Sequence, residues 1–277
     1  MGKLDGKTAL ITGMARGQGR AHALALAAEG ADIFGFDLCA EIATVPYALA
    51  TEADLHETRR QVHELGRRCE TRVVDVRNTV AVDSAVAAMV ESFGTVDICV
   101  ANAGVCAFGK TWELSDDMWD TVVATNLTGV FKTLRAVTPH MIAQGRGRIV
   151  AISSGGGRTG IPNLSHYVSS KWGVLGLVKS LALELAEHGI TVNAVCPATV
   201  DTPMVHNDAF YGLFAPDVPG PTREQVEPRY ALMNPMRVPW VQPADVANAV
   251  LYLVSDEARY VSGSALEVSA GGAAHKV

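Results

Sequence analysis

The sequence predicts a doubly wound α/β fold, in which a parallel sheet of seven strands carries helices on both faces. Short β-rich runs alternate with long amphipathic stretches, and a glycine-rich turn follows the first run. Several of the runs are apolar at consecutive positions, as expected for strands that are covered on both faces. Because no linker interrupts the 277 residues, we expect a single domain that spans residues 1–277.

The chain divides into seven expected strands and five long helical patterns. The strands occupy residues 8–11, 33–37, 72–76, 98–101, 148–152, 191–195 and 265–268, and the helices occupy 21–28, 80–93, 119–141, 168–188 and 243–255. Two segments fit neither pattern, an insertion at 38–53 and a proline-rich stretch at 203–240. Ligands of such folds bind at the carboxyl ends of the strands, so we expect the insertion near a cofactor and the second segment as a substrate lid.

Composition excludes several classes of function. The formal net charge is -6 and no run of Lys or Arg occurs, so we expect neither a nucleic-acid partner nor an anionic membrane partner. The N-terminus lacks an export signal, and no apolar run approaches the ~20 residues of a membrane span, which predicts a cytoplasmic protein. Five scattered cysteines without a CxxC pair indicate buried or half-buried thiols, with no disulfide framework and no metal site.

A glycine cluster between the first strand and its helix is typical of a phosphate-binding loop. Gly13 permits a tight turn, while Gly17 and Gly19 let the backbone approach a ligand closely. The helix that begins near Arg20 offers free N–H groups to a pyrophosphate. The residues expected around the cofactor phosphates are therefore Gly13, Ala15, Arg16, Gly17, Gln18 and Gly19.

The end of the second strand indicates which dinucleotide binds. Asp37 lies where a carboxylate accepts hydrogen bonds from the adenosine ribose of NAD and repels the 2′-phosphate of NADP. Arg16 argues the other way, because a guanidinium pairs well with that phosphate. Leu38 supplies no second cation, so the sequence favours NAD.

Tyr167 and Lys171 form the strongest catalytic signal. They lie four residues apart at the start of an apolar helical pattern, so both side chains share one helix face. A neighbouring ammonium favours the phenolate and thereby brings a tyrosine within reach of general acid and base chemistry. Ser154 ends the fifth strand, thirteen residues before Tyr167, where its hydroxyl could hold a substrate oxygen.

Together with Asn126 and the Asn102-Ala103-Gly104 motif after the fourth strand, these residues make the chain resemble the short-chain dehydrogenases over residues 7–271. The resemblance implies a Rossmann-type nucleotide-binding domain. It further implies that Tyr167 moves the hydroxyl proton during hydride transfer, that Lys171 lowers the pKa of Tyr167 and binds the nicotinamide ribose, and that Ser154 steadies the carbonyl oxygen. It assigns a proton-relay water to Asn126.

The same resemblance implies further cofactor contacts. They are Asp75 and Val76 near the adenine, Asn102, Ala103 and Gly104 beside the cofactor, and Pro197, Val200 and Thr202 around the carboxamide. Ala198 departs from the family pattern, which usually has glycine there. A homotetramer built through the helices at 119–141 and 168–188 is also implied, with the C-terminal segment 271–277 reaching a neighbouring subunit.

The insertion at 38–53 resembles that of a subgroup that includes carveol dehydrogenases and proteins coupled to the peptide-derived redox carrier mycofactocin. In that subgroup the insertion covers an NAD that is not readily exchanged. We therefore expect tightly bound NAD, reoxidised by mycofactocin. Apolar residues of the segment at 203–240 suit a hydrophobic secondary alcohol, such as a terpenoid. They are Met204, Phe210, Tyr211, Phe214, Met233, Met236 and Trp240.

Two other functions remain open from the sequence. One is an NADPH-dependent 3-oxoacyl thioester reductase, against which Asp37 argues. The other is a non-catalytic nucleotide-binding regulatory protein, against which Ser154, Tyr167 and Lys171 argue. His166, next to Tyr167, is interpreted as a surface residue.

Overall fold

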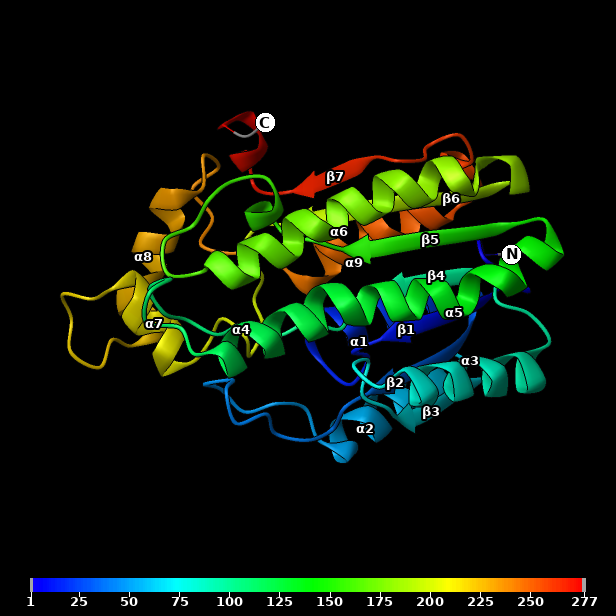
Figure 1. Cartoon of the computed structure of the whole chain (residues 1–277), viewed down its shortest axis with the longest axis horizontal. Helices are drawn as coiled ribbons and strands as arrows, with labels where there is room; N and C mark the ends of the chain where they lie inside the picture. The colour runs from blue at the N-terminus through cyan, green and yellow to red at the C-terminus, as the bar shows by residue number, and fades with distance from the viewer. Residues whose placement is uncertain (1, 276–277) are drawn as a thin grey trace.

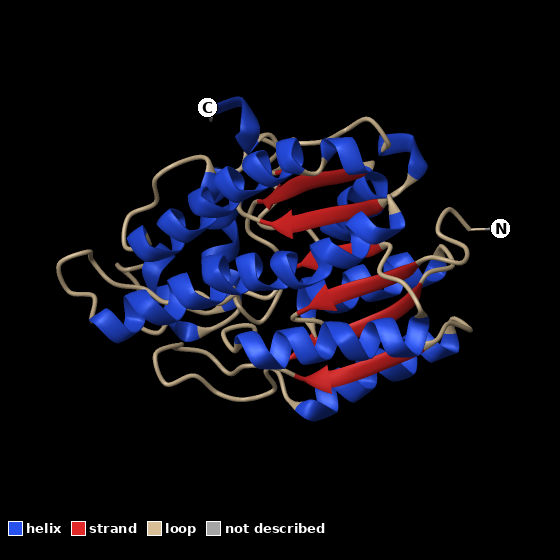
Figure 2. Ribbon diagram, turned by 45° about the vertical axis from the view of Figure 1, so that its right-hand side comes forward, coloured by secondary structure: helices blue, strands red, loops and turns tan. Residues whose placement is uncertain are grey.

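A computed structural model describes residues 2–275 and contains one parallel sheet of seven strands between two layers of helices (Figures 1 and 2). The strand order is β3-β2-β1-β4-β5-β6-β7, and every neighbouring pair is parallel. The strands are β1 Thr8–Thr12, β2 Asp32–Asp37, β3 Cys69–Val73, β4 Ile98–Ala101, β5 Gly147–Ile152, β6 Ile190–Pro197 and β7 Ala265–Val268. The predicted fold class is therefore confirmed.

The third strand was predicted three residues too late, at 72–76. Its register is set by β2, which pairs Ile33 with Cys69 and Asp37 with Val73. β3 lies at the sheet edge, where Val73 is 52% exposed, so its sequence carries little apolar signal. Val74 and Val76, in the loop after β3, are buried in the core, so the sequence of this loop has the apolar pattern of a strand.

Two apolar cores lie on the two faces of the sheet. Leu26 of α1 and Val250 of α9 bury one face, and Leu134 of α5 and Val178 of α6 help to bury the other. The longer helices are α1 Gly17–Ala28, α2 Glu52–Glu64, α3 Thr79–Phe93, α4 Asp116–Val123, α5 Gly129–Gln144, α6 Ser165–Glu184, α7 Asp208–Phe214, α8 Arg223–Met233 and α9 Pro243–Val254. None of the described helices is long and apolar enough to span a bilayer.

The helix predicted at 119–141 differs in detail from the observed one. The chain is helical through α4 and α5, but a π-helical turn, η1 (Ala124–Thr128), joins them. Such turns insert one extra residue per helical turn and often occur at functional sites. This one contains Asn126.

The insertion and the lid lie at the same end of the sheet. In Figure 1 the strand arrowheads point toward α7 and α8, and the loop between β2 and α2 lies at that end too. Helix α2 begins at Glu52, so the loop part of the insertion is residues 38–51. The segment at 203–240 contains the two short helices α7 and α8. Both segments therefore border the carboxyl ends of the strands.

Candidate active site

The loop after β1 has the shape that a pyrophosphate requires. Gly13 has φ +67°, and a Cβ there would lie 2.8 Å from Cα of Ala103. A Cβ on Gly19 would lie 1.9 Å from the carbonyl oxygen of Gly13, so neither position accepts a side chain. No side chain caps the N-terminus of α1, and its first N–H groups remain available to an anion.

The cofactor pocket encloses about 940 Å³ of empty space at this loop. Most of the residues expected to bind the cofactor line it: Gly13, Arg16, Gly17, Gln18, Gly19, Asp37, Leu38, Asp75, Val76, Asn102, Ala103, Gly104 and Thr202. Ala15 does not line it, and its N–H instead donates to Oδ2 of Asp37 at 3.0 Å. Pro197 and Val200 line a second, adjoining pocket.

Asp37 occupies the end of β2, as a ribose-binding carboxylate should. Burial raises its pKa, although the N–H of Ala15 and the charge of Arg16 act in the opposite direction. Ribose hydroxyls would replace the lost water as hydrogen-bond donors. Arg16, which could have favoured NADP, donates instead to the carbonyl of Ala48 in the insertion.

The adenine end of the pocket contains an ion pair that the sequence did not reveal. Nη2 of Arg77 lies 2.7 Å from Oδ2 of Asp75, and the N–H of Arg77 donates to Oδ1 at 2.8 Å. Burial raises the pKa of Asp75, but these hydrogen bonds outweigh it and leave the pKa below its ordinary value. Asp75 is therefore held as a carboxylate acceptor.

The Asn102-Ala103-Gly104 motif joins the cofactor loop to the catalytic residues. The Asn102 side chain donates to the carbonyls of Thr12 at 2.9 Å and Gly13 at 3.1 Å, so it fixes the phosphate loop. A Cβ on Gly104 would lie 3.3 Å from Oδ1 of Asn126 and 3.5 Å from Nζ of Lys171. The glycine thus allows these side chains to meet.

Ser154 and Tyr167 both line the second pocket. Oγ of Ser154 accepts the N–H of Gly156 at 3.0 Å, which orients it. Burial raises the pKa of Tyr167, and the nearby Ser154 hydroxyl partly offsets this. Lys171 was expected to lower the pKa of Tyr167, but in the protein without cofactor it has no such effect.

The position of Lys171 explains this. Its Nζ donates to the carbonyl of Ile152 at 2.9 Å and lies 5.6 Å from the ring centroid of Tyr167. The side chain is 4% exposed, and burial lowers its pKa to about 8. Lys171 thus lies close to Tyr167 and to Gly104, which line the two pockets.

Asn126 is fully buried, and both the oxygen and the nitrogen of its side-chain amide form hydrogen bonds. Oδ1 accepts the N–H of Val105 at 2.8 Å, and Nδ2 donates to the carbonyl of Val105 at 2.8 Å. Its side chain therefore orders the loop after β4.

The second pocket encloses about 1340 Å³ of empty space and has apolar walls. Of the predicted lid residues, Met204, Phe210, Phe214 and Met233 line it. Tyr211 and Trp240 instead pack inside the lid, and Met236 is 71% exposed. Sequence reasoning missed further lining residues, which include Val205 and Asn234 within the lid and Cys106 and Leu164 from other segments.

His166 is not a surface residue, contrary to the prediction. Helix α6 begins at Ser165, so His166 shares its inward face with Ser170 and Val174 and is fully buried. Burial lowers its pKa and favours the neutral ring. Within residues 2–275 no group of three or more His, Cys, Asp or Glu side chains is arranged to hold a metal ion.

The insertion lines the cofactor pocket and is attached to two other loops. Arg16 of the phosphate loop donates to the carbonyl of Ala48. The adjacent Tyr47 hydroxyl accepts the N–H of Cys106, in the loop after β4, at 3.0 Å. Tyr47 and Val45 are buried in an apolar cluster with residues of the loop after β4.

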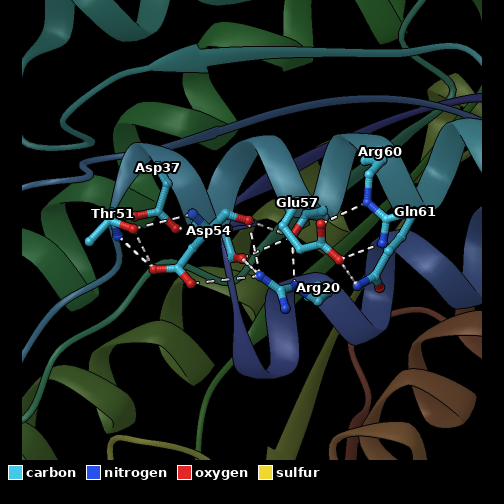
Figure 3. A network of polar contacts seen from close by, with 9 residues as sticks. Arg20, Asp37, Thr51, Asp54, Glu57, Arg60 and Gln61 are labelled. Carbon is cyan, nitrogen blue, oxygen red and sulfur yellow. Dashed lines mark hydrogen bonds and ion pairs between the residues drawn. The ribbon is translucent and has the colours of Figure 1, made fainter.

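The far end of the insertion is fastened to α1. Figure 3 shows Arg20 reaching Asp54 of α2, beside the Thr51–Asp54 capping box. Nη2 of Arg20 donates to the carbonyl of Ala15 at 2.7 Å, and the Thr58 hydroxyl donates to the same carbonyl at 2.8 Å. Helix α2 is therefore attached to the phosphate loop itself.

Comparison with known proteins agrees with this geometry. Residues 7–209 match the model of the short chain dehydrogenase family. The chain is 42% identical to (-)-trans-carveol dehydrogenase of Rhodococcus erythropolis, over 98% of this chain and 99% of that one. The crystal structure of carveol dehydrogenase from Mycobacterium avium in complex with NAD has 47% identity and a TM-score of 0.97, covering 99% and 100% of the two chains.

A second solved structure, a short chain dehydrogenase from Mycobacterium paratuberculosis bound to NAD, has 38% identity and a TM-score of 0.90, covering 98% and 99% of the two chains. The predicted likeness to short-chain dehydrogenases, and to the carveol dehydrogenases among them, is confirmed. The chain belongs to the short-chain dehydrogenase family.

Proposed function

We propose that this NAD-dependent short-chain alcohol dehydrogenase interconverts a hydrophobic secondary alcohol and its ketone, with Tyr167 as general acid and base. The observation that carries the proposal is that Ser154 and Tyr167 line the same apolar pocket, next to the cofactor pocket. Gln18, Thr202 and Met204 line both pockets, so the two are contiguous. The similarity to carveol dehydrogenases supports a terpenoid alcohol.

The residues present fit NAD. A Cβ at Gly13 or Gly19 would collide with the main chain of Ala103 or of Gly13, so glycine is needed for this tight loop, and the uncapped start of α1 lines the pocket. Asp37 accepts ribose hydroxyls and repels a 2′-phosphate, while Arg16 is engaged by Ala48. This arrangement disfavours the NADPH-dependent 3-oxoacyl thioester reductase.

In the oxidative direction, Ser154 and Tyr167 hold the alcohol oxygen. The Tyr167 phenolate removes the hydroxyl proton while the carbinol hydrogen leaves with its electron pair, so a ketone forms and Tyr167 is left protonated. Bound NAD supplies the hydride acceptor and, when oxidised, a positive charge that favours the phenolate. Lys171, fixed by Ile152, holds the ribose and adds its own charge. Reduction of a ketone uses the same groups in reverse.

We also propose that NAD stays bound between turnovers and is reoxidised in place by an external carrier, mycofactocin. Ile42, Tyr47, Leu49 and Ala50 of the insertion line the cofactor pocket, so the insertion forms part of its wall. Its two hydrogen bonds, with Arg16 and with Cys106, attach the adjacent residues Ala48 and Tyr47 to the phosphate loop and to the loop after β4. Both support a cofactor that is enclosed rather than exchanged.

Two measurements test these proposals. Mass spectrometry of nucleotide released on denaturation should show NAD in the purified protein. Carveol should then reduce this bound NAD in a single turnover, followed by the near-ultraviolet absorbance of the reduced nicotinamide, while added NAD supports little further turnover. A protein that purifies empty and cycles rapidly with added NAD contradicts retention.

The role of Tyr167 is tested separately. Tyr167→Phe should slow single-turnover reduction by about 10²–10⁴-fold, the range for loss of a general acid or base. Tyr260→Phe is the matched control, because Tyr260 is 89% exposed. Unchanged rates in Tyr167→Phe remove Tyr167 from the mechanism.

A homotetramer stays a prediction that has some support in the exposed side chains. Large apolar residues lie exposed on the helices expected at the interfaces: Trp119 on α4, Phe131 on α5, and Trp172 and Leu183 on α6. Such side chains are usually covered in oligomers. Sedimentation equilibrium gives the molecular mass directly, and a monomeric mass of 29.3 kDa would contradict the tetramer.

A further inference from the structure

Asp201 occupies a junction between the cofactor pocket and the lid. It lies between Val200 and Thr202, which line the substrate pocket. Its N–H donates to the carbonyl of Val241 at 3.0 Å, and Val200 forms a parallel β-bridge with Val241. The main chain at Asp201 is thus fixed from outside the lid.

Three parts of the chain converge on the Asp201 carboxylate. Oδ1 lies 2.6 Å from Nε2 of His206, just before α7. Oδ2 accepts from Nη2 of Arg223 on α8 at 3.1 Å and from Gln242, the N-cap of α9, at 3.4 Å. Burial raises the pKa of Asp201, but the bonds from His206 and Gln242 and the charge of Arg223 leave it below its ordinary value.

His206 extends this network into α7. Its Nδ1 lies 2.8 Å from the hydroxyl of Tyr211, so a neutral ring that donates from Nε2 to Asp201 can accept the Tyr211 proton at Nδ1. Trp240 covers the cluster, with its ring 4.7 Å from both the His206 ring and the Arg223 guanidinium carbon. Tyr211 and Trp240 are buried, which limits competition from water.

The network controls the wall of the substrate pocket through α7. Phe210 precedes Tyr211 in that helix, and Phe210 and Phe214 both line the pocket. Their rings stack with centroids 5.2 Å apart. A displacement of Tyr211 therefore moves both aromatic rings relative to Ser154 and Tyr167.

We propose that Asp201 is a positioning residue that holds the lid over the substrate pocket and thereby sets the affinity for large apolar alcohols. It acts through His206 and Tyr211 on α7 and through Arg223 on α8, and touches neither substrate nor cofactor. Only the identity of the substrate rests on the proposed function. The fastening of the lid is a property of the protein itself.

Asp201→Asn tests this, because Asn keeps the shape but presents an N–H₂ group to donors. We expect faster amide hydrogen exchange across residues 203–240. We also expect the KM for carveol to rise about tenfold, which corresponds to a loss of about 1.4 kcal/mol in binding free energy. The rate of hydride transfer at saturation and the NAD content should change little. Tyr211→Phe, which removes only the bond to His206, should shift exchange and KM in the same direction by a smaller factor.

Asp217→Asn is the matched control. Asp217 pairs with Arg229, but Asp217 is exposed, Arg229 is half-buried, and this pair lies within the lid and does not fasten it to the rest of the protein. Unchanged lid exchange in both Asp201→Asn and Tyr211→Phe overturns the proposal. Faster exchange with carveol inactive in every variant, wild type included, supports the fastening and refutes the proposed substrate instead.

Discussion

The insertion at 38–51 and the lid at 203–240 cover neighbouring pockets in different ways. The insertion has no regular secondary structure, yet hydrogen bonds hold it to the phosphate loop and to the loop after β4. The lid contains the helices α7 and α8, and its side-chain hydrogen bonds to the rest of the described protein converge on Asp201, while the N–H of Met236 donates to the carbonyl of Ala270 at 3.1 Å. Its outer residues Met233 and Met236 are 54% and 71% exposed.

This difference matches what each pocket has to do. An insertion attached to two separate loops opens only when both attachments break, which suits the proposed retention of the cofactor. A lid whose side-chain attachments meet at Asp201 can move about that junction, which suits a substrate that enters and a product that leaves. On the proposed function, the two covers would separate retention of NAD from exchange of the alcohol.

Of the predictions made from this comparison, the largest effect is expected on the free energy of unfolding, through Lys171, which is buried close to residues of both pockets. Burial lowers its pKa from 10.5 to about 8. Between these pH values the unfolded chain binds a proton that the folded protein has lost, so this group makes the free energy of unfolding rise with pH. The rise should approach about 3 kcal/mol, since one pKa unit corresponds to about 1.4 kcal/mol.

Urea unfolding of nucleotide-free protein from pH 7 to 11 measures this rise. Buried thiols such as Cys99, whose pKa burial raises to about 12, act in the opposite direction, so the difference between wild type and Lys171→Met is the quantity to follow. Lys179→Met, on the exposed face of the same helix, is the control. If the free energy of unfolding has the same pH dependence in wild type and in Lys171→Met, the lowered pKa of Lys171 is contradicted.

Local spacing was enough to predict the phosphate loop and the Tyr167 and Lys171 pair. Each consists of residues that are close in sequence, and a single turn or helix fixes their geometry. Partners distant in sequence were missed. Tyr47 and Cys106 are 59 residues apart, and Asp201 and Arg223 are 22 apart. No periodicity in the sequence reports such contacts.

The errors have a similar origin. The third strand was misplaced because an edge strand shows little apolar patterning, whereas Val74 and Val76 are buried from a loop. His166 was placed at the surface because its helix was expected to begin three residues later, at 168. Both features depend on packing between elements rather than on the residues themselves.

The next largest effect is expected from releasing the insertion. Tyr47→Phe with Arg16→Gln removes both polar fastenings while leaving the apolar cluster in place. Two lost hydrogen bonds, one of them to a charged group, should weaken NAD binding by about 100-fold and make the bound NAD exchangeable. Dialysis against labelled NAD measures the exchange, with Tyr260→Phe as control. Retention as tight as in wild type shows that the fastenings do not enclose the cofactor.

The smallest effect is expected at Phe210, a lid residue that contacts the same loop as the insertion does, the loop after β4. Its ring lies 5.2 Å from that of Phe108 in an edge-to-face contact. Phe108 follows two residues after Cys106, which holds Tyr47 of the insertion. The loop after β4 therefore contacts both covers, and Phe210 is the place where coupling between them would appear.

Phe210→Leu keeps this position apolar but shortens the pocket wall. We expect kcat/KM to fall about tenfold for carveol relative to isopropanol, because a small alcohol does not reach the wall, while NAD retention stays unchanged. Leu232→Ala, at a lid position that is 70% exposed, should change neither quantity. If Phe210→Leu also releases NAD, the loop after β4 transmits motion from lid to insertion. The two covers would then open together, and retention and exchange would be one property instead of two.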